Sequence, residues 1–373
     1  MGRYLNPGME SFEKSVNSEI YVDKTGLVGY TNRVMNTVQG YVCVSRPRRF
    51  GKSMAANMLT AYYSRGCDSR EIFSKFEISE SPDFEKYRNK YNTIFLNMQE
   101  FLSRSDSVEA LVDRVKKLVL RDLKREYPDV DYFDDTDLVE SMQDIYETEK
   151  CPFVVIIDEW DCIFREFRQN KEAQEKYLDF LRDLLKDKAC IHLAYMTGIL
   201  PIKKYGTHSA LNMFDEFSMI NPGPLAPYVG FTEVEVEYLC HKYRMDMEEV
   251  KAWYDGYSFS MAASVYSPRS VVNSMLFGKI ENYWNQTETF EALQVYIDMN
   301  FDGLKDDVLS MIAGERIPVN TGSFTNDMTT FRTEDDVLTL LIHLGYLAYD
   351  SENKVVKIPN NEVRNEYVNS VAA

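Results

Sequence analysis

The sequence has no cysteine or histidine spacing that suits a disulfide framework or a zinc site. Its six cysteines are scattered without a C-x-x-C pair, and its four histidines are isolated. The first 20 residues lack the apolar core of a signal peptide, and the longest nearly apolar run, 337–349, is too short to span a bilayer. We therefore expect a soluble, cytoplasmic protein with reduced cysteines and no membrane partner.

Positive charge is also scarce. The chain has 42 Lys and Arg against 59 Asp and Glu, a net charge of −17, which makes nucleic acid an unlikely partner. Residues 231–373 carry 11 basic and 23 acidic side chains, whereas residues 1–60 carry 8 and 4. The length of 373 residues and the hydrophobic content of 45% indicate a globular protein of two or three domains. An anionic ligand is expected in the basic region.

One glycine is missing from the stretch that otherwise fits a phosphate-binding loop. An apolar run (41–44) leads through an Arg-rich turn to Gly51-Lys52-Ser53 and a helical pattern, but Arg46 stands at the first glycine of G-x-x-x-x-G-K-[ST]. In a P-loop, Lys52 would reach the terminal phosphates and Ser53 would bind Mg²⁺. The alternative is a basic turn before a surface helix. The predicted nucleotide contacts are Arg46, Pro47, Arg48, Arg49, Phe50, Gly51, Lys52, Ser53 and Met54.

A second motif supports the phosphate site. Residues 153–161 read FVVIIDEWD, and the β-branched run predicts a strand that is buried on both faces, as in a parallel sheet. Asp158 and Glu159 follow at its carboxyl end, where open α/β sheets have their sites. Asp158 would hold Mg²⁺, and Glu159 would deprotonate the attacking water. This Walker B element, about 105 residues after Ser53, indicates a P-loop NTPase. Trp160 is interpreted as packing, and Asp161 as a carboxylate without an assigned role.

Three further strands, 92–98, 191–196 and 216–220, complete an α/β fold with a mostly parallel five-stranded sheet flanked by helices. Thr197 follows one of these strands and could sense the γ-phosphate or form a simple turn. The predicted domains are an ATPase core (1–228), a helical lid (229–300) and a winged-helix-like module (301–373). That module is acidic, so a protein contact or a packing role is favoured over DNA binding.

The motifs together resemble the bacterial predicted AAA-ATPase family, AAA-ATPase-like proteins grouped with the STAND-type P-loop ATPases. The resemblance covers nearly the whole chain, and the family also lacks the first Walker glycine. Trp160 stands where the family commonly has tyrosine. Many members carry a C-terminal nuclease-like domain of the PD-(D/E)xK type, but no Asp…Glu-x-Lys strand pair follows residue 361 in this sequence, so nuclease activity is not assigned to this chain. The matching motifs are YVDKT (21–25), SRPRRFGKS (45–53), IIDEWD (156–161), TG (197–198), SALNMF (209–214), GFTEVEV (230–236), WYDGYSF (253–259), VYSPRSV (265–271) and YW (283–284).

The resemblance implies an ATPase that uses ATP and Mg²⁺, with Lys52, Glu159, Thr197 and Arg49 in catalytic roles and Ser53 and Asp158 on the metal. Arg48 or Arg49 could stabilise the transition state or only shape the loop. The first alternative is a nucleotide-gated switch or scaffold with little turnover, in defence or signalling. The second is a nucleic-acid-associated ATPase. Coupling of nucleotide state to lid movement, and a protein partner or self-association, are expected.

Overall fold

The computed structural model describes residues 1–202, 210–284, 290–326, 328–329 and 331–372. Ser209, the first residue of the SALNMF motif, lies outside this set. The described residues form two compact units. Unit 1 contains 1–44, 52–198 and 210–216, and unit 2 contains 45–51, 199–202 and the described residues from 217 onward. The domain boundaries expected at residues 228 and 300 stay predictions. Within the described residues, no helix has the length and apolar character needed to cross a membrane.

Unit 1 is built on a five-stranded sheet in the order β2-β3-β4-β1-β5. β2 pairs with β3, and β3 with β4, in parallel. Every residue of β3 is buried, which explains its uninterrupted apolar sequence. The sheet confirms the predicted P-loop NTPase α/β fold, with β4 between the P-loop strand β1 and the Walker B strand β3. The strands are β1 (Tyr41–Ser45), β2 (Asn92–Asn97), β3 (Phe153–Asp158), β4 (Ile191–Gly198) and β5 (Asp215–Phe217).

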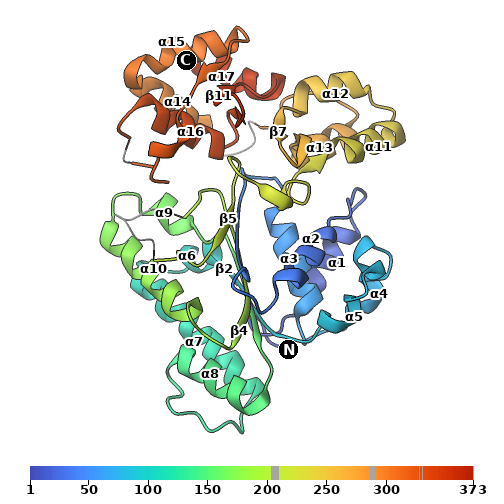
Figure 1. The fold of residues 1–373 in the computed structure, drawn as a ribbon, viewed down its shortest axis with the longest axis vertical. Coiled ribbons are helices and arrows are strands. Elements are labelled where there is room, and N and C mark those ends of the chain that lie inside the picture. The colour runs from blue at the N-terminus through green and yellow to red at the C-terminus, as the bar shows by residue number, and fades with distance from the viewer. Residues whose placement is uncertain (203–209, 285–289, 327, 330, 373) are drawn as a thin grey trace. The chain divides into compact units, whose positions relative to one another are not determined.

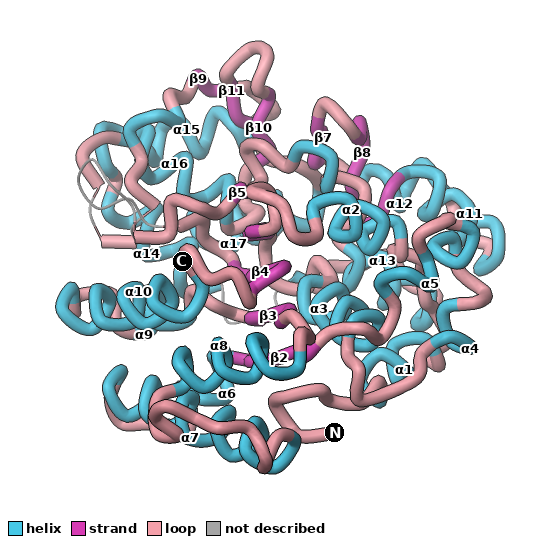
Figure 2. The backbone as a smooth tube through the Cα atoms, turned by 60° about the horizontal axis from the view of Figure 1, so that its bottom comes forward, coloured by secondary structure: helices cyan, strands magenta, loops and turns pink. Residues whose placement is uncertain are grey.

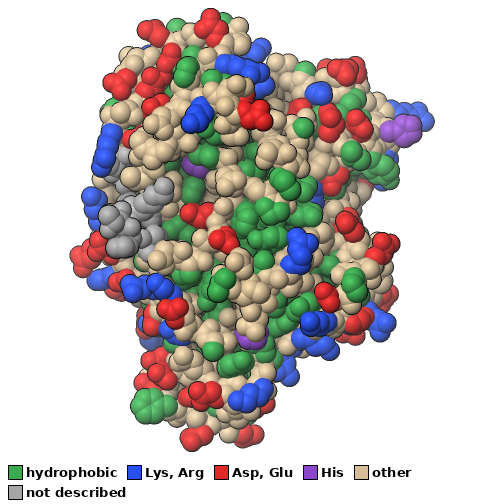
Figure 3. Space-filling model, in the orientation of Figure 1, with side chains coloured by type: hydrophobic (Ala, Val, Ile, Leu, Met, Phe, Trp, Pro, Cys, Tyr) green, Lys and Arg blue, Asp and Glu red, His purple; other side chains and the backbone are tan. Residues whose placement is uncertain are grey.

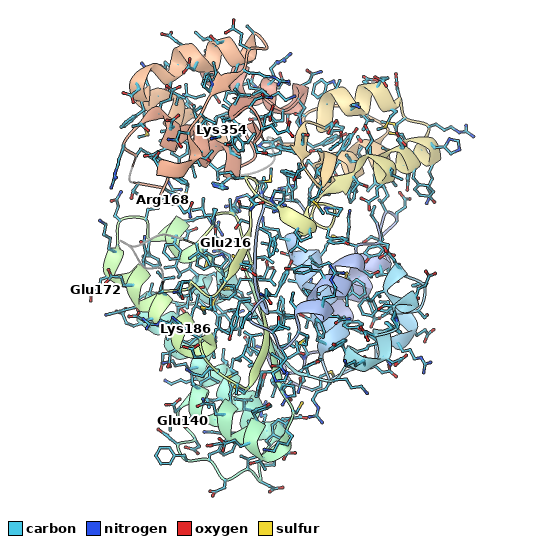
Figure 4. All side chains as sticks on the ribbon, in the orientation of Figure 1. Glu140, Arg168, Glu172, Lys186, Glu216 and Lys354 are labelled. Atoms are coloured by element: carbon cyan, nitrogen blue, oxygen red, sulfur yellow. The ribbon has the colours of Figure 1, made fainter. Side chains whose placement is uncertain are left out.

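Helices cover both faces of this sheet (Figures 1 and 2). One layer consists of α1 (Glu10–Val16), α2 (Gly26–Val34), α3 (Lys52–Tyr63), α4 (Arg70–Phe73) and α5 (Phe84–Tyr87). The other consists of α6 (Met98–Ser103), α7 (Val108–Glu126), α8 (Leu138–Glu149), α9 (Cys162–Glu166) and α10 (Lys171–Leu185). Charged side chains such as Glu140 on α8 and Glu172 on α10 extend outward from the second layer (Figure 4).

Side-chain caps set where two long helices of unit 1 begin. Ser107 Oγ accepts a hydrogen bond from the Ala110 amide at the start of α7. Asp137 Oδ1 accepts one from the Glu140 amide at the start of α8. The acidic run 129–137 therefore ends in the N-cap residue of α8.

The last strand of the sheet is shorter than predicted. The sequence indicates a strand over 216–220, but β5 ends at Phe217. Ser218 Oγ accepts hydrogen bonds from the amides of Ile220 and Asn221, and Pro222 follows. This hydroxyl turn replaces the pairing that a longer strand would need.

Unit 2 contains two small sheets as well as helices. The segment 229–300, which the sequence predicts as a helical lid, contains helices but also β6, β7 and β8, which form a sheet in the order β6-β8-β7. Nearer the C-terminus, β10 and β11 form an antiparallel pair, which β9 joins. Whether this part is a winged helix stays a prediction. The elements are β6 (Phe231–Thr232), α11 (Glu233–Tyr243), α12 (Met247–Tyr254), β7 (Tyr257–Phe259), β8 (Ala262–Tyr266), α13 (Pro268–Phe277), α14 (Phe290–Met299), α15 (Leu304–Ile312), β9 (Ile317–Pro318), α16 (Glu334–His343), β10 (Ala348–Asp350), β11 (Val355–Lys357) and α17 (Asn361–Ala372).

Much of the acidic excess of unit 2 lies in the first turns of its helices. Glu233 and Glu235 begin α11, Asp306 and Asp307 begin α15, and α16 opens with three consecutive acidic residues. Carboxylates there interact favourably with the helix dipole. Acidic and basic side chains are interspersed over the face drawn in Figure 3.

Candidate functional site

The turn after β1 contains the residue that replaces the first Walker glycine. Arg46 is fully buried, and its Nη1 atom donates to the carbonyl oxygens of Ser45 and Phe217, each at 2.8 Å. Its guanidinium also lies 5.9 Å from the centre of the Phe259 ring. These contacts hold the turn from within unit 2. The predicted contact of Arg46 with nucleotide stays a prediction.

The next residues of the turn also pack within unit 2. The Phe50 ring meets the Tyr257 ring edge to face at 5.5 Å. Pro47 lies so close to Gly345 that a Cβ there would be 2.7 Å from Pro47 Cγ. Gly51 has a φ of +92°, a conformation that favours glycine. This positive φ explains why the second Walker glycine is kept when the first is not.

Arg48 and Arg49 line a small pocket of unit 2 together with Arg269 and Trp284. The pKa of Arg49 is lowered, first by burial and then by the charges of Arg269 and Arg48. Three guanidinium groups therefore gather at one place, which favours an anion. The nucleotide contacts of Arg48 and Arg49 stay predictions.

In unit 1, the carboxylate of Asp158 is hydrogen-bonded to two other predicted site residues, Ser53 and Thr197. Asp158 is almost fully buried at the end of β3. Its Oδ2 atom accepts a hydrogen bond of 2.7 Å from Ser53 Oγ at the start of α3, and its Oδ1 atom accepts one from Thr197 Oγ1 at the end of β4. Parallel pairing of β3 with β4 places Thr197 at the same sheet edge. Met54, predicted as a nucleotide contact, is partly exposed on α3.

Lys52, the first residue of α3, is buried near the same carboxylates. Burial lowers its pKa to about 8, against the opposing effect of Asp161 and then of Asp158. A buried ammonium with a lowered pKa is stabilised by an incoming anion. The position thus suits a phosphate-binding lysine.

Glu159 is half-buried and adopts a left-handed conformation with a φ of +53°. Its amide lies 3.1 Å from Asp158 Oδ1 and 3.3 Å from Thr197 Oγ1, so the turn after β3 is held by its neighbours. Burial raises the pKa of the Glu159 carboxyl, and the charge of Arg165 opposes this shift. A carboxylate with a raised pKa is a stronger base, as general-base catalysis requires.

The structure adds Asp161 and Arg165 to the predicted site. Asp161 is fully buried and lies 3.5 Å from the Arg165 guanidinium. Trp160 is fully buried, its carbonyl accepts a hydrogen bond from Tyr177 Oη, and its predicted packing role is confirmed. In the sequence, Arg165 stands four residues after Asp161, a spacing at which two side chains on a helix can form an ion pair. This spacing alone does not distinguish a buried ion pair from one on the surface.

The hydroxyl of Ser53 and the carboxylate of Asp158 suit a hard divalent cation. Most of the other ligands of such an ion would be water and phosphate oxygens. The described residues contain no group of three or more His, Cys, Asp or Glu side chains that could hold a metal ion. Ser53 Oγ and Asp158 Oδ2, from the two side chains predicted to bind the metal, lie 2.7 Å apart. Mg²⁺ is commonly bound by one or two such ligands together with substrate phosphates.

Several known proteins are similar to this chain. A curated relative from Azotobacter chroococcum mcd 1, described as an uncharacterized protein in the vnfD 5′ region, is 25% identical over 298 residues. That match covers 76% of this chain and 54% of the relative, so the chain spans about half of the relative's length.

Two solved structures are similar at 12% identity. The Walker-type ATPase PABY2304 of Pyrococcus abyssi has a TM-score of 0.48, with 92% of this chain and 94% of that chain covered. The ORC2 protein of Aeropyrum pernix, in ADPNP–ADP complexes, has a TM-score of 0.35, with 95% and 98% covered. The family model described as Predicted AAA-ATPase matches residues 6–207, more than half of the chain. The chain therefore belongs to the Predicted AAA-ATPase family.

Proposed function

We propose that this protein binds ATP with Mg²⁺ and hydrolyses its β–γ phosphoanhydride bond. The observation that supports this most strongly is the position of Asp158, whose carboxylate is bonded to both Ser53 and Thr197 beside the buried Lys52. Such a group suits a triphosphate and its metal. Family membership supports ATP binding in general.

In the proposed complex, the amides after Gly51 and the Lys52 ammonium bind the β- and γ-phosphates. Ser53 and Asp158 would hold the metal ion, which supplies positive charge at the β- and γ-oxygens. Thr197 donates a hydrogen bond to Asp158 through its hydroxyl, and we propose that it responds to the γ-phosphate. Arg49, two residues before Gly51, would add a further positive charge to the bound phosphates.

Hydrolysis requires Glu159 to act as a general base. Its carboxylate orients a water molecule and accepts a proton while the water oxygen bonds to the γ-phosphorus. The bond from the γ-phosphorus to the bridging oxygen breaks, so ADP leaves with that oxygen and inorganic phosphate forms. Burial raises the pKa of Glu159 and so favours this proton transfer.

A second candidate is a nucleotide-gated switch with little turnover. It is favoured by the packing of the loop 45–51 within unit 2, where Arg46 binds the Phe217 carbonyl and Phe50 contacts Tyr257. Nucleotide that reshapes this loop would affect residues 229–300, which we propose as the lid. We expect the readout to be a protein partner or self-association, because the acidic charge disfavours nucleic acid.

Titration with ATP, ADP and GTP, with and without Mg²⁺, tests the binding proposal. We expect Mg²⁺ to strengthen ATP binding by the wild type and to have little effect on Ser53→Ala. Ser103→Ala is the matched control, because Ser103 is also exposed and its hydroxyl binds only the Glu100 carbonyl in the described structure. Absence of ATP binding by the wild type, or equal Mg²⁺ effects in wild type and Ser53→Ala, would refute the proposal.

A further inference from the structure

Arg165 is a buried cation that the hydrolysis scheme above does not use. Its side chain is 7% exposed, and its Nη2 atom lies 3.5 Å from Asp161 Oδ1. The Nε and Nη2 atoms have no hydrogen-bond acceptor among the residues that the structure describes. Buried guanidinium donors without acceptors are costly, and an absent ligand is one physical explanation for them.

The position of Arg165 on α9 directs its side chain toward the phosphate site. Helical side chains lean toward the N-terminus of their helix, and residues four apart share a face. α9 begins at Cys162, three residues after Glu159 and four after Asp158, the last residue of β3. The ion pair with Asp161, the residue before α9, shows that the Arg165 side chain extends back toward this end of the helix. The charge of Arg165 acts on both Lys52 and Glu159, so both lie within its electrostatic range.

Asp161 lies between the Arg165 guanidinium and Gly198, the last residue of β4. It is fully buried, and a Cβ at Gly198 would lie 2.8 Å from Asp161 Oδ1, so the carboxylate has little room to move. The pKa of Lys52 is affected by the charges of Asp161, Asp158, Arg165 and Glu159, so these groups lie within electrostatic range of Lys52. When a metal ion engages Asp158 and a phosphate engages Lys52, Arg165 retains two nitrogen donors for a further anionic oxygen.

We propose that Arg165 is a second phosphate-binding cation, which donates through Nε and Nη2 to an oxygen of the terminal phosphate of bound ATP. The inference rests on the nucleotide site proposed above and adds to it a group that distinguishes ATP from ADP. An arginine from the same chain in this position also stabilises charge on the γ-phosphoryl oxygens during transfer. Asp161 is the positioning residue that holds it.

The test compares ATP and ADP affinity in a Glu159→Gln background, where hydrolysis does not disturb binding. Arg165→Gln should weaken ATP binding about tenfold or more, the loss expected for a hydrogen bond to a charged group, and change ADP binding less than about threefold. Arg165→Lys should recover part of the ATP affinity. Arg168→Gln is the control, because Arg168 is exposed three residues further on and its Nε atom donates to the Arg165 backbone carbonyl, which Arg165→Gln keeps.

Thermal unfolding separates phosphate binding from a structural role. The pair variant Asp161→Asn with Arg165→Gln removes both charges and should regain stability without regaining ATP-over-ADP preference. Parallel loss of ATP and ADP affinity that follows the loss of stability, or unchanged affinities in Arg165→Gln, would overturn the inference. If the Glu159→Gln parent binds neither nucleotide, the proposed function itself fails, which is a different result.

Discussion

Thr197→Val removes one hydroxyl from the Asp158 site and keeps the side-chain shape. In the wild type, Thr197 Oγ1 donates to Asp158 Oδ1 and lies 3.3 Å from the Glu159 amide. Valine leaves the buried carboxylate with Ser53 and the Glu159 amide as donors. A hydrogen bond to a charged group contributes about 1.5–3 kcal/mol, which corresponds to roughly 10- to 100-fold in rate if it is needed in the transition state.

The assay is steady-state phosphate release with denaturant unfolding measured beside it. Thr60→Val is the matched control, because Thr60 is also buried in unit 1 but donates only to the Ala56 carbonyl of its own helix in the described structure. It should cost about 0.5–1.5 kcal/mol of stability and leave kcat/KM nearly unchanged. Equal kcat/KM for the two variants would refute the role assigned to Thr197.

Three further changes test the geometry of the site. Gly51→Ala should destabilise the protein by about 1–3 kcal/mol, because Gly51 has a positive φ. Gly29→Ala should stabilise it by about 0.5–1 kcal/mol, because Gly29 lies in α2 with open space around it. Denaturant unfolding that gave changes of the same sign for both variants would contradict this prediction. Gly198→Ala should cost about 1–3 kcal/mol because its Cβ meets Asp161 and Trp160 at 2.8 Å, and an unchanged unfolding free energy would show that this edge is loosely packed. The pKa of Lys52 is lowered to about 8 from an ordinary 10.5, so between these pH values the unfolded chain binds more protons than the folded chain. The stability of the wild type should therefore rise relative to that of Lys52→Met as pH increases from about 8 to 10.5. Parallel curves of unfolding free energy against pH for the two proteins would contradict this prediction.

The sequence was sufficient for those parts of the site that short-range patterns determine. The apolar run 153–157, followed by Asp158 and Glu159, predicts a buried strand with carboxylates at its end, and β3 has this form. Thr197 was identified because a polar residue after a neighbouring parallel strand reaches the same edge. Its hydrogen bond to Asp158 also needs the register of β3 with β4, which no local pattern contains.

Other features depend on contacts between distant residues. The binding of Arg46 to the Phe217 carbonyl joins residues 171 positions apart, so its role in the loop could not be read from the turn alone. The sheet β6-β8-β7 has no clear signal in the sequence, because its strands are two to five residues long and two of them directly precede or lie close to helix starts. β5 was predicted too long because the Ser218 turn competes with strand pairing.

Steady-state release of phosphate from ATP with Mg²⁺, by wild type, Glu159→Gln and Lys52→Ala, tests the proposed hydrolysis most directly. Nucleotide affinity is measured on the same samples. We expect Glu159→Gln to bind ATP like the wild type but to turn over about 10²- to 10⁴-fold more slowly, and Lys52→Ala to lose ATP affinity. Wild-type turnover in Glu159→Gln, or ATP binding by the wild type without any Glu159-dependent phosphate release, would contradict the proposed hydrolysis.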